Sequence, residues 1–365
     1  MQTNRMKRLG VGLAVCTAVA VSSWPIKASH AQYDFHLTVD GTTYSCDYAG
    51  LSAAIDAVNE VWNGVITLNC PGQNIYFPAN GAKTIRGGFV LDGLDANTAR
   101  LDGAGGVDTR FFIIEPNASV ILRNITLQNA KQTGNGGAIL IKGQGQLGLE
   151  NSVIAYCEAM TNGDYRVGKG GAIYMEGEGW VVLRSSELNG NFAHAFAHDA
   201  GAAIAAPWGL GNVVLDNSKL FYNGKSGHPG SVIVAKSVQI TSSHVENNPG
   251  YAIVSEADIF QIESSLFQNN NGVSFISNGL IINNSLFQGN GTIFSRDRNI
   301  TITHSEFNGN RRMFSQIRPW GVPRGNVVID TSVFVGNGYD DTERYPSLAM
   351  VMTTPKGTQV LIFVM

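Results

Sequence analysis

The sequence is poor in charge. Charged residues make up 15% of its 365 residues and the formal net charge is −3, whereas an average soluble protein has about 25% charged residues. A strongly basic nucleic-acid-binding protein and a chain with an acidic tail are therefore excluded. Hydrophobic residues, at 44%, are not scarce, which argues against disorder, because disordered chains combine low hydrophobicity with high net charge.

Long apolar runs are also missing, and no stretch reaches the 18 apolar residues typical of a membrane span. The short apolar run at residues 9–21 follows three cations within residues 5–8, and small residues stand before a cleavage point at Gln32. This pattern predicts a signal peptide over residues 1–31 and a secreted or cell-surface protein. Cys16 leaves a lipoprotein open as the alternative, although a large valine precedes it.

Cysteine is scarce as well, because the mature chain keeps only three. Cys46 and Cys70 bracket one short segment, and export makes a bridge between them the expected state. Cys157 lies in the repeat region described below and is predicted to be a buried free thiol.

Glycine and asparagine are abundant instead, at 43 and 32 residues, and they belong to two recurring phrases. The first is x-V-x-[LI]-x-[NS]-S-x-[FLV]-x-x-N, as in VVLRSSELNGN at residues 181–191 and LIINNSLFQGN at residues 280–290. The second begins as GGAI at residues 136–139 and 170–173 and degenerates along the chain. Both recur at steps of about 20 to 34 residues, which is the signature of a repeat architecture.

Both phrases alternate apolar and polar residues, which indicates strands. A unit of about 20 residues leaves no room for a βαβ crossover, which needs about 30. We therefore predict an all-β parallel solenoid, a β-helix of about ten coils with a short N-terminal capping helix. Residues 32–100 hold the cap and first strands, and residues 101–365 hold the β-helix. A column of asparagines is expected to hydrogen-bond from coil to coil (Asn191, Asn223, Asn248, Asn270, Asn290, Asn310 and Asn337).

The cap is predicted over residues 51–62, because apolar residues recur there at helical spacing and a solenoid end must be covered. The apolar positions are Leu51, Ile55, Val58 and Trp62.

The repeats resemble those of secreted right-handed parallel β-helix proteins in the broad pectate-lyase-like superfamily. GGAI followed by F-x-x-N, as at residues 287–290 and 307–310, is similar to repeats of chlamydial polymorphic outer-membrane proteins. Residues 45–59 and 66–70 resemble the N-terminal cap of bacterial secreted β-helix proteins, although the Arg-Glu pair of that cap is replaced here. The resemblance implies the fold and says little of function, because one fold hosts many activities.

Outward columns of the predicted strands carry no cluster suited to acid–base catalysis, which needs neighbouring titratable groups with displaced pKa values. One column alternates in sign over its first four members (Arg123, Glu150, Arg184 and Asp216) and is expected to be a structural ladder. A second column is apolar (Leu140, Tyr174, Ala205, Val234, Val254 and Ile276).

Loops are the remaining place for a site. The longest, at residues 157–169 and 191–200, supply the catalytic candidates Asp164, Arg166, Lys169, His194, His198 and Asp199. Candidates for ligand contact are Tyr174 in the apolar column and Trp320, Arg318 and Arg324 in an insertion.

Two functions follow from these observations. The first is a non-catalytic secreted or surface rod, adhesin-like or glycan-binding, whose partner is a polysaccharide or a host or cell-surface component. The alternative is a polysaccharide lyase or glycoside hydrolase with a cleft over residues 157–200. We expect a monomer without cofactor, nucleic-acid partner or membrane span, and a calcium ion only for a lyase. Convergence of the loop candidates on one cleft would favour the enzyme.

Overall fold

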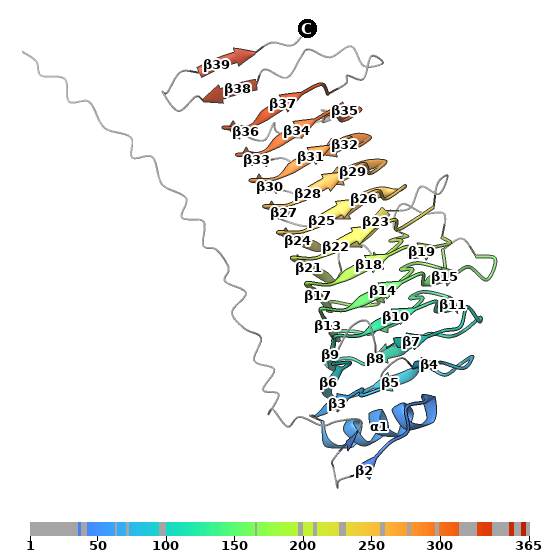
Figure 1. The fold of residues 1–365 in the computed structure, drawn as a ribbon. Helices are drawn as coiled ribbons and strands as arrows, with labels where there is room; N and C mark the ends of the chain where they lie inside the picture. Colours follow the sequence, from blue (N-terminus) through green and yellow to red (C-terminus); the bar gives the residue numbers. More distant parts are fainter. Residues whose placement is uncertain are drawn as a thin grey trace, which may run out of the picture.

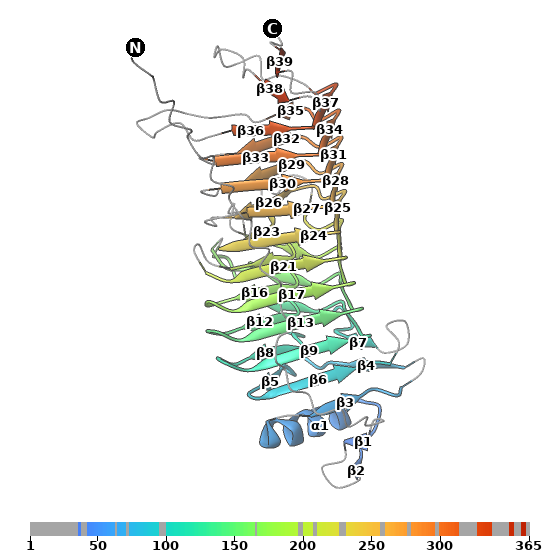
Figure 2. The same ribbon diagram turned by 90° about the vertical axis from the view of Figure 1, so that its left-hand side faces the viewer.

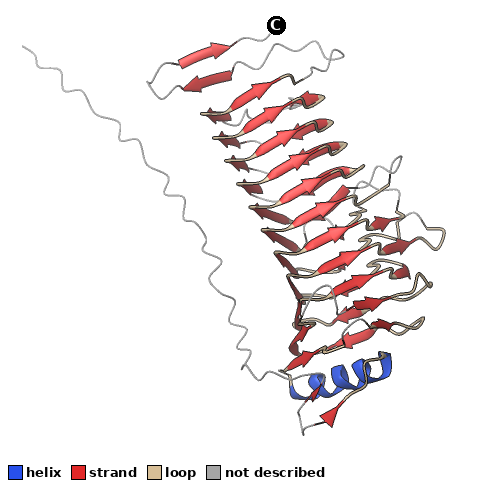
Figure 3. Cartoon of the chain, viewed as in Figure 1, coloured by secondary structure: helices blue, strands red, loops and turns tan. Residues whose placement is uncertain are grey.

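The computed structural model describes residues 36–37, 42–62, 64–70, 73–94, 100–164, 166–195, 200–206, 210–225, 231–255, 260–275, 279–295, 299–313, 327–337, 350–353 and 359–362. This part of the chain is a right-handed parallel β-helix with a helix at its N-terminal end, as predicted (Figures 1 and 2). Strand dominates over helix along the whole rod (Figure 3). The predicted signal peptide lies outside the described residues.

Each coil crosses three long sheets in turn, here called sheets 1, 2 and 3. Sheet 1 contains β3 (Val65–Thr67), β6 (Gly88–Asp92), β9 (Ser119–Arg123), β13 (Gln146–Glu150), β17 (Trp180–Arg184), β21 (Asn212–Asp216), β24 (Ser237–Thr241), β27 (Phe260–Glu263), β30 (Gly279–Asn283), β33 (Asn299–Thr303), β36 (Val327–Asp330), β38 (Met350–Thr353) and β39 (Gln359–Ile362). Its strands are parallel except that β39 pairs antiparallel with β38.

Sheets 2 and 3 are parallel throughout. Sheet 2 contains β4 (Asn74–Tyr76), β7 (Arg100–Asp102), β10 (Thr126–Gln128), β14 (Val153–Ala155), β18 (Glu187–Asn189), β22 (Lys219–Phe221), β25 (His244–Glu246), β28 (Leu266–Gln268), β31 (Leu286–Gln288), β34 (Glu306–Asn308) and β37 (Val333–Val335). Sheet 3 contains β5 (Lys83–Ile85), β8 (Phe112–Ile114), β12 (Ile139–Ile141), β16 (Ile173–Met175), β20 (Ile204–Ala205), β23 (Ser231–Ala235), β26 (Tyr251–Ser255), β29 (Gly272–Phe275), β32 (Thr292–Ser295) and β35 (Arg312–Met313).

Sheet 2 has eleven strands, so the described chain makes eleven coils, close to the ten expected. Three middle coils add a small side sheet of β11 (Lys131–Thr133), β15 (Glu158–Met160) and β19 (Phe192–Ala193). Residues 157–169 and 191–200, predicted as loops, therefore begin with short strands. A separate hairpin of β1 (His36–Leu37) and β2 (Thr42–Thr43) precedes the cap.

Each copy of the longer phrase forms two strands, one in sheet 1 and one in sheet 2. With the strand in sheet 3, each coil has three main strands. In residues 181–191 the chain turns at Ser185, whose φ of 48° is left-handed, and sheet 2 begins two residues later. The residue at the same place in other coils also has a φ between 46° and 52° (Asn124, Asn151, Asn217, Ser242, Ser264, Asn284, His304 and Thr331). The second half of the phrase therefore faces a different side of the rod from the first half.

The inside of the rod is mainly apolar, and two columns of buried polar residues run along it. Phenylalanine rings stack along sheet 2, with centroids 4.7 Å apart for Phe267–Phe287 and for Phe287–Phe307. The predicted asparagine ladder is confirmed, and each buried side chain bonds to the next coil, as in Asn270 Nδ2 to Asn290 Oδ1 at 2.9 Å. The buried serines form a second ladder, in which each backbone N–H donates to the hydroxyl one coil on.

The cap is α1 (Tyr48–Val61), which begins three residues earlier than predicted because Asp47 caps it. The Asp47 carboxylate accepts a hydrogen bond from the Gly50 N–H at 2.8 Å, which lowers the pKa of that carboxyl. Leu51, Ile55 and Val58 are buried as predicted, but Trp62 is 61% exposed. The prediction was wrong for Trp62 because this residue ends the helix in a left-handed conformation, outside the buried stripe.

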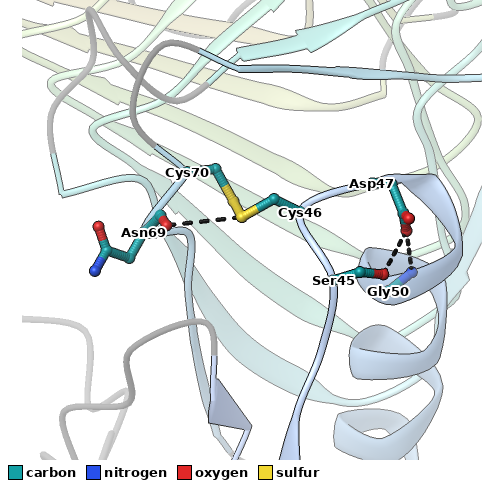
Figure 4. Close-up of a disulfide and its surroundings, with 6 residues drawn as sticks. All are labelled: Ser45, Cys46, Asp47, Gly50, Asn69 and Cys70. Carbon is teal, nitrogen blue, oxygen red and sulfur yellow. Dashed lines mark hydrogen bonds between the residues drawn. A yellow bond between two sulfur atoms is a disulfide. The ribbon is translucent and has the colours of Figure 1, made fainter.

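The cap is tied to the first coil by the predicted Cys46–Cys70 disulfide, which is confirmed (Figure 4). The Asn59 side chain adds two hydrogen bonds to that coil, to the Thr84 carbonyl and from the Arg86 N–H. Cys157 is a buried free thiol, as predicted.

Candidate functional site

The catalytic candidates of the first long loop make hydrogen bonds that shape the loop and join it to the preceding coil. The Asp164 carboxylate accepts the N–H of Arg166 at 2.9 Å, and the Lys169 N–H donates to the Asn135 side chain at 3.1 Å. Asp164 is exposed. Its carboxylate is thus committed to the shape of the loop.

His194 belongs to a cluster on the side sheet. Its Nε2 lies 3.3 Å from the Glu158 carboxylate, whose other oxygen is 3.4 Å from Lys131 Nζ. No hydrogen bond or ion pair joins Asp164 to His194 in the described chain. His198 and Asp199 lie outside the described residues. Asp164 and Arg166 meet through the Arg166 backbone N–H, whereas His194 pairs with Glu158, which is not one of the candidates.

Of the candidates for ligand contact, one lies within the described residues and three lie outside them. Tyr174 lies in the predicted apolar column of sheet 3, paired in register with Leu140 and Ala205. Its exposure is only 8%, and it packs in a small cluster with these two residues, so little of its ring faces solvent. Arg318, Trp320 and Arg324 lie outside the described residues, as does Ile276 of the same column.

The predicted charge ladder on sheet 1 is confirmed. Glu150 pairs in register with Arg123 and Arg184, and its oxygens lie 2.8 Å and 3.5 Å from their guanidinium nitrogens. Asp92 extends the ladder by one coil, 3.7 Å from Arg123. These partly exposed charges neutralise each other across coils, as opposite charges on neighbouring strands do.

The outer face of sheet 2 holds chemistry that the sequence analysis did not identify. In each strand of this sheet the middle residue is inward, so the first and third form two outward rows parallel to the rod axis. The first row contains Glu187, Lys219, His244, Leu266, Leu286 and Glu306. The second row contains Asn189, Phe221, Glu246, Gln268, Gln288 and Asn308.

Two shallow hollows lie on this face and share His244. The first, of about 250 Å³, is lined by Lys219, Leu220, Phe221, Tyr222, His244, Glu246 and Asn247. The second, of about 380 Å³, is lined by His244, Ser264, Ser265, Leu266, Asn284, Ser285, Leu286, His304 and Glu306. The two hollows share His244 as a lining residue, and the surface that they cover from β22 to β34 is called here the sheet-2 groove.

The charged groups of the groove are largely matched by neighbours. His244 Nδ1 lies 2.8 Å from the Glu246 carboxylate. Glu187, just before the groove, pairs in register with Lys219. Burial raises the pKa of Glu187, and the Lys219 ammonium opposes that shift. The groove therefore offers hydrogen-bonding groups rather than a strong field.

Aromatic rings border the N-terminal end of the groove. Tyr156 and Tyr222 occupy the left-handed turn after sheet 2, with φ of 54° and 55°, and are 57% and 59% exposed. Phe221 packs edge-on to Tyr222, with ring centroids 5.5 Å apart. The Tyr156 ring lies against Gly190 of the next coil, where an added Cβ would come within 2.7 Å of the ring.

The sequence does contain the signal for this face. In the repeat phrase the first and third positions after the central serine give the two outward rows. The prediction missed them because the phrase was treated as a single strand, whereas the turn before the serine starts a new face.

No protein-family model matches the chain, and no curated protein matches it either. No helix within the described residues is long and apolar enough to cross a membrane. Among the same residues, no three His, Cys, Asp or Glu side chains gather as a metal site would require. Fold and surface chemistry therefore carry the functional argument.

Proposed function

We propose that this protein is an exported, non-catalytic rod that binds an extended glycan along the sheet-2 groove. We also propose that it is related to secreted pectate-lyase-like β-helix proteins, on the resemblance of its repeats. The observation that carries the binding proposal is a pair of hollows that share His244 and follow one another along the rod axis. A linear polymer matches a surface that extends over several coils.

The side chains around the groove suit sugars. Tyr222 and Phe221 offer aromatic surface on which the C–H face of a sugar ring packs, and Tyr222 adds a hydroxyl. Leu266 and Leu286 give an aliphatic floor farther along. The amides of Gln268 and Gln288, themselves 3.2 Å apart, both donate and accept hydrogen bonds, as sugar hydroxyls require.

The non-catalytic part of the proposal rests on the separation of titratable groups. The ladder of sheet 1 is internally neutralised, and Asp164 and His194 have separate partners. In the groove, the carboxylate nearest a base is Glu246, which binds His244. This arrangement supports binding without bond cleavage.

The test is binding of the mature chain to insoluble cellulose and xylan, with reducing sugar and unsaturated product measured in the same tubes. We expect retention without product. The variant Tyr222→Asn should weaken retention about 3- to 10-fold, because it removes one aromatic contact. Asparagine suits the left-handed turn and stands at the equivalent Asn247 and Asn269, so the fold is preserved.

The matched control is Tyr76→Asn, which removes a tyrosine of similar exposure, 57%, from sheet 2 in the first coil. Its binding should equal that of the unchanged protein. Equal loss in both variants, or no retention at all, would argue against the groove. Release of sugar would instead favour the lyase or hydrolase alternative.

A further inference from the structure

We infer that the sheet-2 groove selects uncharged glycans and rejects acidic ones, an inference that rests on the glycan-binding function proposed above. Within the described residues, fixed negative charges outnumber fixed positive charges along the groove. Its lining contains one lysine, Lys219, and two glutamates, Glu246 and Glu306. Counted over these three residues, the formal charge of the lining is negative.

The cation at the N-terminal end of the groove has a carboxylate as its register neighbour on the preceding coil. Lys219 is the register partner of Glu187 on the preceding coil. Its ammonium favours the ionised form of that carboxyl. A uronate placed beside Lys219 would therefore also meet the Glu187 carboxylate.

The histidine at the junction of the two hollows is engaged in the same way. His244 Nδ1 is 2.8 Å from Glu246 Oε1, and Glu246 is the third residue of the same strand. A ligand that crosses from one hollow to the other passes this pair. Protonation of His244 would yield a neutral ion pair rather than a free positive charge.

Carboxylates also stand at the far end and along the rim. Glu306 is exposed at the end of the second hollow. Asp216 and Glu263 close the sheet-1 strands of two coils, directly before the turns that lead into sheet 2. Like charges on an approaching polymer are repelled along this length, and exposed groups repel less at high salt.

The remaining contacts favour neutral sugars. Between His244 and Glu306 the lining is Ser264, Leu266, Asn284, Leu286 and neighbouring serines and histidine, none of which carries a negative or a fixed positive charge. Hydroxyls and ring C–H groups match this stretch, whereas a carboxylate would lose water without gaining a cation. Uncharged glycans are thus the class that the groove fits.

The experiment compares retention on xylan and a mixed-linkage glucan with retention on polygalacturonate, at low and high salt. We expect polygalacturonate to bind at least about tenfold more weakly at low salt, with the difference shrinking as salt rises. The double variant Glu246→Gln, Glu306→Gln should raise polygalacturonate binding several-fold relative to xylan binding, so that the ratio of the two affinities moves toward one.

The matched control is Glu60→Gln with Asp164→Asn, which removes the same number of charges from exposed sites on the cap and the side loop. It should not change the discrimination. Polygalacturonate binding as tight as xylan binding, and still sensitive to Tyr222→Asn, would overturn the inference while the proposed function stands. Failure of every glycan to bind would remove the proposed function, and this inference with it.

Discussion

Cys157 shows how one residue is fixed by its column. It occupies the position that asparagine fills in later coils, and its N–H donates to the Asn191 side chain at 3.0 Å. The thiol lies fully buried and donates to the Ala155 carbonyl at 3.3 Å. Burial raises the pKa of Cys157 to about 12 from an ordinary 9.0, because the thiolate would have to leave water. The nucleophilic form is therefore absent at neutral pH.

We predict that Cys157 does not react with a maleimide in the native protein at pH 8 and reacts fully after unfolding in denaturant. The measurement is the mass increase on labelling under the two conditions. The linked effect on stability has a definite sign. The folded state holds the proton more tightly, so this contribution is complete below pH 9 and is lost as the pH rises toward 12. Stoichiometric labelling of the folded chain would contradict this account.

At the scale of the element, the asparagine ladder joins neighbouring coils inside the rod. Asn270 accepts hydrogen bonds from the N–H and the side-chain amide of Asn248, and donates to the Val245 carbonyl and to Asn290. All these groups are buried, so they have no water to replace a lost partner.

Asn270→Ala is expected to lower the free energy of unfolding by about 2–4 kcal/mol, because it leaves buried donors and acceptors unsatisfied. Asn212→Ala is the control, since Asn212 is an outward, partly exposed residue at the start of β21. It should cost less than about 0.5 kcal/mol. The midpoints of urea denaturation measure both, and similar midpoints would show that the ladder contributes little.

The strands themselves were more predictable than the corners. Apolar alternation identified the core-facing residues of sheet 1, and register pairing confirmed the column from Arg123 to Asp330. The corner inside the phrase was not predicted, because serine and asparagine are compatible with both a strand end and a continuing strand. Only the left-handed φ at residues such as Ser185 makes the chain bend there. The candidate site was missed for the same reason.

At the scale of the whole molecule, stability is expected to be uneven along the rod. Each coil contacts only its neighbours, so a defect at one end weakens that end first. The N-terminal end is covered by α1 and fastened by the Cys46–Cys70 bridge, which spans 24 residues (Figure 4). A bridge of this kind contributes about 2–4 kcal/mol.

Replacing both cysteines, as in Cys46→Ala with Cys70→Ala, should therefore expose the first coils to local opening. We predict faster amide hydrogen exchange over residues 65–92 and unchanged exchange over residues 260–295, which serve as the control within the same molecule. Uniformly faster exchange along the rod would mean that the coils unfold as one unit, contrary to nearest-neighbour stability.

The sequence alone determined the coil, the cap, the disulfide and the asparagine column. Each of these depends on a period, a spacing or a residue type along the chain, and such patterns can be recognised without a structure. Tertiary structure alone decided which side chains share a face. Lys219, Tyr222, His244 and Glu306 lie in separate repeats of different length, and they form one groove only because coil-to-coil hydrogen bonds set the register and each corner turns the chain. The scarcity of charge in the sequence acquired its meaning there, because the groove has one lysine against two glutamates.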